Sequence, residues 1–365
     1  PATAPACQVA ATVITTTFNT LLSTIDLAAT TTAASLGTAA SAGPGGGKNG
    51  GAVAAADSRE KEKKRLLHLA RKMMMAPFGL APFSEEDIAR LRDQADGKGD
   101  WDPDANQRGI GDCYLLATLQ GHSRTEDGQQ FLRDQVRWDE KKNCFVVTLY
   151  DHGRPVDVEV RDTYTNGNRG QTSMIDIYER AYSIHYGNES LSSGGRAGDA
   201  MDHIAGEDSY GVDTGGRILG VIPWNQHEYA KDEWDEIQQA VQDGRPVVGL
   251  TGRGDFSHGD AATATTDTNN NGKIDGASAQ RPDREGTYRI AGGNYDHDPK
   301  TPEAGHSYTV VAVDDEGVTL RNPWGYNDNA DPNLPRADND GLIRISRADY
   351  EKYFSYTYIG KIPGH

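Results

Sequence analysis

The sequence predicts an α+β protein, in which a mainly helical part is followed by a part rich in β-strands. Helical patterns, with apolar residues three and four positions apart, are prominent in the chain up to about residue 215. Short apolar runs of strand length, bounded by Gly, Pro and Asp turns, dominate the rest. A Gly-rich stretch at 39–51 is typical of a flexible linker and sets apart an Ala/Thr/Gly-rich segment before it.

These changes of character divide the chain into four regions. One modestly apolar helix is expected between about residues 6 and 34, in the Ala/Thr/Gly-rich segment. After the linker, a Lys/Arg-rich surface helix ends before Pro77, and a short helix with an acidic first turn begins behind Ser84. The four expected regions are an N-terminal segment with its linker at 1–56, a mostly helical extension at 57–100, a cysteine-bearing subdomain at 101–215 and a β-rich subdomain at 216–365.

Within the last two regions each element follows from a local pattern. A helix is expected to begin at Cys113, and alternating strands at 144–150 and 156–160 are expected to form a hairpin. Gly244 follows the amphipathic helix at 232–242, as is common just after a helix C-terminus. The other expected elements are helices at 175–186, 199–204 and 347–354, strands at 247–250, 288–290, 307–313, 318–321, 341–346 and 356–362, and a long polar loop at 251–286.

Composition excludes several classes of partner and site. A net charge of −17 argues against a nucleic-acid partner and against binding to anionic membranes. No run of about eighteen apolar residues is present, so no membrane span is expected. The three cysteines, Cys7, Cys113 and Cys144, contain no CxxC pair, so neither a disulfide framework nor a Cys-based zinc site is expected. The first residues lack a signal-peptide pattern, so we expect a cytoplasmic protein or one secreted without a visible signal; the oligomeric state stays open.

Cys113 has the sequence context of a nucleophile. It follows a Gly-rich turn and precedes an apolar run of helical character. A thiol at a helix N-terminus meets unpaired N–H groups and the positive end of the helix dipole, which favour the thiolate. The same N–H groups can hold an oxyanion, and Gln107 offers a side-chain amide six residues upstream. The alternative is a buried, inert cysteine, so the hypothesis needs a base elsewhere in the chain.

His306 is the candidate base. It stands at the beginning of the apolar strand expected at 307–313, and the next strand ends just before Asn322. Two strands paired across a turn at 314–317 bring these two side chains to the same edge of a sheet. An Asn oxygen that accepts from one ring N–H fixes the imidazole tautomer, and Trp324 is placed to cover that hydrogen bond. Cys, His and Asn in this order match the triad of thiol proteases.

Several segments resemble the calpain family of papain-like cysteine proteases. The resemblance covers roughly residues 100–362 in the family's order, with Tyr114 where the family has Trp. The spacing from His306 to Asn322 is shorter than in animal calpains. The matching segments are 107–117 (QRGIGDCYLLA), 177–182 (IYERAY), 191–195 (LSSGG), 305–310 (GHSYTV), 320–325 (LRNPWG) and 340–346 (DGLIRIS).

The resemblance implies a papain-like, calpain-type protease core with the active site between two subdomains. It implies an endopeptidase that hydrolyses peptide bonds of protein substrates through a thioester, and autoprocessing in the linker at 43–57 is a further expectation. The implied roles are Cys113 as nucleophile, His306 as base and acid, Asn322 as its orienting group and Gln107 as oxyanion donor.

No cofactor is expected for the chemistry, but two places are candidates for Ca²⁺. In calpains an acidic residue three positions before the oxyanion Gln helps to hold a core calcium; Asp104 stands there, but Thr172 or Ser173 replaces its partner glutamate. A separate segment reproduces the start of an EF-hand loop, with Ser278 at the last position instead of the bidentate Glu. A polar Asn/Gly loop that only matches the pattern is the alternative. Its candidate ligands are Asp267, Asn269, Asn271, Asp275 and Lys273 by its backbone carbonyl.

Two other functions remain open at this point. The same triad supports acyl transfer to an amine, as in transglutaminases. A calpain-like module that binds proteins without catalysis is the other alternative, although all four implied catalytic positions are intact.

Overall fold

A computed structural model describes most of the chain beyond residue 78. Residues Met74–His365 form one compact unit. The N-terminal segment at 1–56 and residues 57–78 of the helical extension lie outside the described residues. The described residues are 79–102, 105–168, 170–188, 191, 194–218, 222–225, 228–251, 261–266, 274, 284–292, 305–331, 333, 340–354 and 356–362.

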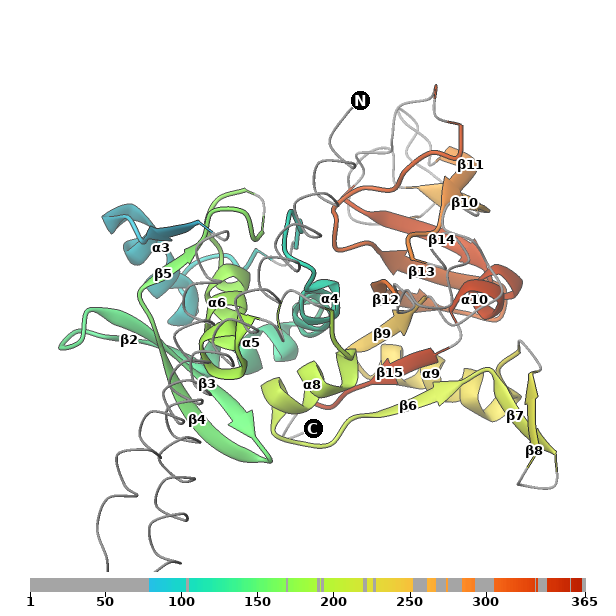
Figure 1. The fold of residues 1–365 in the computed structure, drawn as a ribbon, viewed down its shortest axis with the longest axis horizontal. Helices are drawn as coiled ribbons and strands as arrows, with labels where there is room; N and C mark the ends of the chain where they lie inside the picture. Colours follow the sequence, from blue (N-terminus) through green and yellow to red (C-terminus); the bar gives the residue numbers. More distant parts are fainter. Residues whose placement is uncertain are drawn as a thin grey trace, which may run out of the picture. The chain divides into compact units, whose positions relative to one another are not determined.

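The described residues form a mixed structure of seven helices and four antiparallel sheets, which confirms the α+β class (Figure 1). The sheets have two, three, two and eight strands, and every pairing between their strands is antiparallel. Among these residues no helix has both the length and the hydropathy that crossing a membrane requires.

Helix α4 (Cys113–His122) is the centre of the first part. Every residue of α4 after Cys113 is buried, because α5, α6 and α8 pack around it on one side and strands β9 and β12 on another. Helix α3 begins behind Ser84, whose side chain accepts a hydrogen bond from the Asp87 amide at 3.0 Å, as the sequence predicts. The other elements here are α3 (Glu85–Ala95), α5 (Glu126–Asp134), α6 (Met174–Tyr186), α8 (Ala197–Ala205), the sheet β2-β3-β4 (Val136–Asp139, Cys144–Asp151, Arg154–Val160) and the pair β1 (Leu80–Pro82) and β5 (Asp162–Tyr164).

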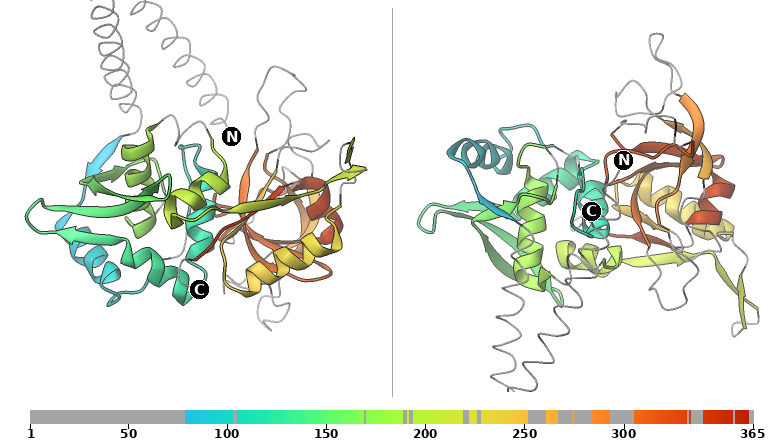
Figure 2. Two further views of the ribbon diagram at one scale, coloured as in Figure 1. Left: turned by 90° about the horizontal axis from the view of Figure 1, so that it is seen from below. Right: turned by 45° about the horizontal axis from the view of Figure 1, so that its top comes forward.

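The second part is built on an eight-stranded sheet with the order β11-β10-β14-β13-β12-β9-β15-β6. Helices α9 and α10 pack on this sheet, and their Trp234 and Tyr350 share a core with Tyr308 and Val310 of β12 (Figure 2). The elements are β6 (Tyr210–Asp213), α9 (Lys231–Gln242), β9 (Val247–Leu250), β10 (Ala261–Thr266), β11 (Arg284–Arg289), β12 (Ser307–Val313), β13 (Gly317–Arg321), β14 (Leu342–Ser346), α10 (Arg347–Tyr353) and β15 (Tyr356–Ile359), with the separate hairpin β7 (Gly215–Ile218) and β8 (Ile222–Asn225).

Two hydrophobic clusters correspond to these two parts, and they meet at the sheet. The cluster around α4 includes Val248 of β9 and Tyr358 of β15, so the helical part packs directly on strands of the second part. Strand β12 contacts both parts of the structure. Tyr308 and Val310 belong to the cluster of α9 and α10, while Thr309 donates a hydrogen bond to the Ala117 carbonyl of α4.

The main difference from the expected fold is strand β10, which lies inside the polar loop predicted at 251–286. Its sequence, AATATT, offers little apolar area, so no hydrophobic pattern signals a strand. The strand forms because both of its edges are paired, with β11 on one side and β14 on the other. Helix α5 and strand β2 were also not expected. The sequence of α5 is largely polar, so it shows little of the apolar spacing that indicates a helix.

A buried histidine in α4 predicts an acid-sensitive fold. Both ring nitrogens of His122 are buried and have no hydrogen-bond partner in the part of the chain that the structure describes, and burial lowers the pKa of His122 to about 3. A lowered His pKa contributes stability that is present above the usual 6.5 and is lost as pH falls. The ring packs on Phe131 with centroids 5.3 Å apart, so Phe keeps this aromatic contact and removes the two unpaired nitrogens.

We therefore expect His122→Phe to be more stable than the wild type in urea unfolding, with an advantage that grows by about 2 kcal/mol between pH 7 and pH 5. The other titrating groups are common to both proteins and cancel in the comparison. An advantage that is the same at both pH values would contradict the buried, unpaired histidine.

Candidate active site

Cys113 is the first residue of α4 and the only one of that helix that is not fully buried. The preceding residue, Asp112, has non-helical backbone angles, and its carbonyl accepts from the amides of Leu115 and Leu116 at 2.9 and 3.1 Å. The Tyr114 amide instead faces the Cys113 sulfur and lowers the pKa of the thiol. The helix thus presents the thiol at its N-terminus, as the sequence predicts.

His306 and Asn322 are brought together by the β12–β13 hairpin. His306 directly precedes β12 and Asn322 directly follows β13, and His306 Nε2 lies 3.0 Å from Asn322 Oδ1. Because an amide oxygen only accepts, Nε2 carries the proton and Nδ1 is the basic nitrogen. Asn322 Oδ1 is itself fixed by the Trp324 amide, which donates to it at 3.1 Å.

Aromatic rings enclose the imidazole. The ring centroid of His306 lies 4.5 Å from that of Trp324 and 5.0 Å from that of Tyr308. This burial lowers the pKa of His306 to about 4, although the hydrogen bond to Asn322 acts in the opposite direction. The imidazole is therefore neutral at pH 7 and able to accept a proton.

The environment of the Cys113 sulfur favours the neutral thiol. Although the side chain is partly exposed, the atoms packed around the sulfur desolvate it and raise the pKa of the thiol to about 11; the nearby Asp112 carboxylate acts in the same direction, while the Ser307 and Tyr114 amides and the Ser307 hydroxyl oppose them. The helix N-terminus therefore contributes as expected but does not outweigh burial. Among the described residues no hydrogen bond joins Cys113 to His306, so the resting pair is a neutral thiol and a neutral imidazole.

Gln107 is buried beside Cys113, and its side-chain amide is already occupied. Nε2 donates to the Ile110 carbonyl at 2.7 Å and to Asp112 Oδ1 at 3.0 Å, which uses both of its hydrogens. Its main-chain amide donates to the Pro323 carbonyl at 2.7 Å. Gln107 therefore lies close to the residue that precedes Cys113, but it can donate to an oxyanion only after one of its side-chain hydrogen bonds is released.

A buried pair of carboxyl groups lies behind the nucleophile, and sequence reasoning missed it. Asp112 precedes Cys113, and Glu179 reaches it from α6. Burial raises the pKa of Glu179 well above its usual value and that of Asp112 to about 7, and nearby Asp176 adds to both. The two carboxyl groups share a proton at neutral pH, and the larger upward pKa shift at Glu179 favours the proton on that side chain. The only sequence signal was an acidic residue on the apolar face of the helix at 175–186.

The candidate calcium ligands cannot be placed. Asp104 and the loop residues Asp267, Asn269, Asn271, Lys273 and Asp275 lie outside the described residues. Within the part of the chain that the structure describes, no three His, Cys, Asp or Glu side chains are grouped so that they could hold a metal ion.

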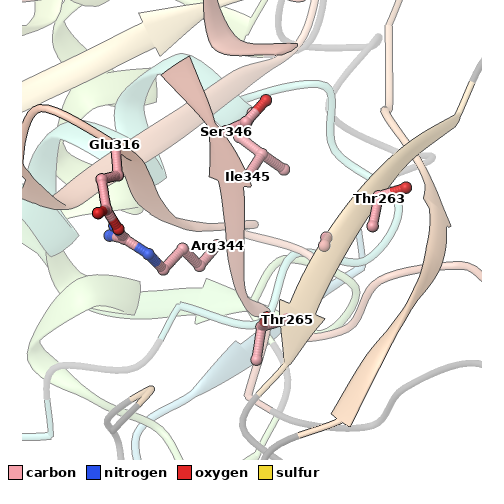
Figure 3. A pocket seen from close by; sticks show the side chains of 7 residues that line it. Thr263, Thr265, Glu316, Arg344, Ile345 and Ser346 are labelled. Carbon is pink, nitrogen blue, oxygen red and sulfur yellow. The ribbon is translucent and has the colours of Figure 1, made fainter. Parts of the chain in front are cut away.

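A shallow pocket of about 190 Å³ between β10 and β14 does not involve these residues (Figure 3). Arg344 lines it, and Figure 3 shows the Glu316 carboxylate turned toward the Arg344 guanidinium. Arg344 also donates to both carboxylate oxygens of Asp314, at 2.7 and 2.8 Å. Its charge is therefore already balanced, and the pocket offers no separate catalytic group.

Comparison with known proteins gives no assignment. No protein-family model matches the chain, and no curated protein is significantly similar to it. The geometry around Cys113 and His306 therefore carries the functional interpretation.

The buried acid pair predicts a fold that weakens as pH rises. The raised pKa of Glu179 contributes stability that is fully present below the usual value of 4.5 and is lost as pH rises toward the pKa of the folded state. Glu179→Gln keeps a hydrogen-bond donor for Asp112 and removes one titrating acid. We expect this variant to lose less unfolding free energy than the wild type between pH 5 and pH 8, as measured by urea unfolding.

Glu126→Gln, an exposed carboxyl-to-amide change on α5, is the matched control and should follow the wild type. Parallel curves for Glu179→Gln and the wild type would show that Glu179 is not protonated in the folded protein.

The enclosure of His306 predicts the effect of removing its aromatic cover. Trp324→Ala should let water reach the imidazole and raise the pKa of His306 from about 4 toward 6.5. NMR titration of the histidine ring protons measures this pKa directly, and His306→Gln identifies the resonance. A His306 pKa that is unchanged in Trp324→Ala would contradict burial as the cause.

Proposed function

We propose that this protein is a cysteine endopeptidase with a papain-like, calpain-type core, which hydrolyses peptide bonds of protein substrates through a thioester. The observation that supports the proposal is the packing of the helix that begins with Cys113 on the strand that follows His306. The thiol begins a helix that is packed on β12, and His306, held by Asn322 at 3.0 Å, directly precedes that strand. The alpha-plus-beta division and the order of the three residues along the chain agree with this class of enzyme.

Because the Cys113 thiol and the His306 imidazole are both neutral at rest, the first step includes a proton transfer. His306 Nδ1 takes the Cys113 proton as the sulfur attacks the peptide carbonyl, so charge separation develops with the new bond. The Cys113 main-chain amide at the helix N-terminus stabilises the oxyanion, joined by Gln107 once its side chain turns from Asp112. The tetrahedral intermediate collapses, and His306 gives its proton to the leaving amine.

Deacylation repeats these roles with water. His306 removes a proton from a water molecule that attacks the thioester carbonyl, and the second tetrahedral intermediate releases the acid and returns the proton to the sulfur. Asn322 keeps the ring in the tautomer whose Nδ1 is basic throughout both halves of the reaction.

Hydrogen bonds of the chain itself hold the two parts of the site together. The Gln107 amide donates to the Pro323 carbonyl at 2.7 Å, Thr309 Oγ1 to the Ala117 carbonyl at 2.9 Å, and Arg124 to the Val310 carbonyl at 3.1 Å. These contacts support a site that forms without added Ca²⁺, so we expect activity to persist in a calcium chelator.

The proposal predicts that purified protein cleaves casein and that Cys113→Ala loses at least about 10³-fold in rate with its circular dichroism unchanged. Asn322→Ala should lose about 10²-fold, because the base remains but is no longer oriented. Cleavage should persist in the presence of EGTA. Self-cleavage in the 43–57 linker, detected as a new N-terminus, should disappear with Cys113.

Product analysis separates the alternatives. Cleavage by Cys113→Ala would show that the mechanism is wrong. Cross-linked or amine-labelled products in mass spectra would indicate an acyl transferase of the transglutaminase type. If an epoxysuccinyl inhibitor failed to label Cys113 and no product formed, a non-catalytic binding module would be the better description.

A further inference from the structure

Ser307 carries a buried hydroxyl group that has no role in the proposed steps of catalysis. It is the first residue of β12, follows His306 directly, and is 1% exposed. Among the described residues, its Oγ has no hydrogen-bond partner within the usual distance and angle limits. Buried hydroxyl groups are nearly always hydrogen-bonded, so the direction in which this side chain points needs an explanation.

The register between β12 and α4 gives that direction. Thr309 lies two residues further along β12, on the same face as Ser307, and its Oγ1 donates to the Ala117 carbonyl at 2.9 Å. Two residues of strand cover about 6.7 Å and four residues of helix about 6 Å, so Ser307 faces Cys113 when Thr309 faces Ala117.

A second contact indicates that the strand and the helix run in the same direction. Arg124, beyond the C-terminal end of α4, donates to the Val310 carbonyl at 3.1 Å. The residues of β12 therefore follow one another along α4 in the same direction as the helix itself, from Cys113 at its beginning to Arg124 after its end. The opposite face of β12 is occupied, because Tyr308 packs against Phe354 with ring centroids 5.3 Å apart.

The surroundings of the sulfur agree with this register. The Ser307 main-chain amide and the Ser307 hydroxyl both face the Cys113 sulfur, and both lower the pKa of the thiol. The other titratable groups near the sulfur are Asp112, which precedes Cys113, and Tyr308, whose ring lies on the opposite face of β12; His306 directly precedes Ser307. Among the described residues, none of these three side chains donates a hydrogen bond to the sulfur in the resting state.

We propose that the Ser307 hydroxyl donates a hydrogen bond to the Cys113 sulfur as the thiolate forms, which makes Ser307 a further catalytic residue. The thiol proton moves to His306 Nδ1, and the Ser307 proton stays on its oxygen, so no additional reactant is needed. The hydroxyl compensates locally for the burial that disfavours a charged sulfur. This inference rests on the proposed function only in taking Cys113 as the nucleophile.

The test is the pH dependence of Cys113 alkylation by iodoacetamide, followed by peptide mapping so that only this cysteine is counted. Ser307→Ala should raise the midpoint of the profile by about one pH unit and slow alkylation about tenfold below it, since one donor to a charged sulfur is lost. Ser307→Thr keeps the hydroxyl and should restore the profile to that of the wild type. Because alkylation needs no substrate, the result does not depend on peptide cleavage.

Ser123→Ala is the matched control, because it removes a buried hydroxyl at the other end of α4, about 15 Å along the helix. Its profile should be that of the wild type. An unchanged profile in Ser307→Ala, or an equal shift in Ser123→Ala, would overturn the inference. A shift in Ser307→Ala alone, in a protein that cleaves no peptide, would uphold the inference while the proposed function fails.

Discussion

The contact between helix α4 and strand β12 is the constraint on which the rest of the site depends. The helix carries the thiol, the strand follows the imidazole, and neither element alone brings the two groups together. Thr309 and Arg124 fix the position of the strand along the helix through main-chain carbonyls, so side-chain packing does not have to set that position. Since every residue of α4 after Cys113 is buried, the helix has little freedom to rotate, and the thiol keeps one orientation.

Burial gives this site its rigidity and also sets its electrostatics. The aromatic rings around His306 and the packing around Cys113 keep both groups neutral, while Asp112 and Glu179 place a shared proton behind the nucleophile. A site of this kind does not store a preformed ion pair. It has to generate charge during the reaction, so the donors around the sulfur and the carbonyl oxygen contribute mainly in the transition state. The side-chain amide of Gln107 also contributes only during the reaction. It becomes available to the oxyanion when a substrate breaks its hydrogen bond to Asp112.

Local signals in the sequence were sufficient for much of the fold and for the central residues of the site. The helix that begins at Cys113, the cap at Ser84 and the hairpin that joins His306 to Asn322 each depend on residues close together in the chain. Features that depend on distant pairing were not predictable. Strand β10 forms because β14 pairs with it from about eighty residues away, and Glu179 approaches Asp112 only when α6 packs beside α4. The upward shift of the Cys113 pKa also follows from this packing, and no local sequence pattern indicates it.

The irregularity in β12 has a consequence for how the sequence can change. The pairing of β12 with β13 shifts register between Val310 and Ala312, and Arg124 donates to the carbonyls of Val310 and Val311 at this bulge. An insertion or deletion of one residue before the bulge would turn Ser307 and Thr309 away from α4. The length of β12 is therefore constrained together with the side chains of Ser307 and Thr309. Strand β11, at the edge of the sheet, is under no comparable constraint, so length variation among related chains should concentrate near it.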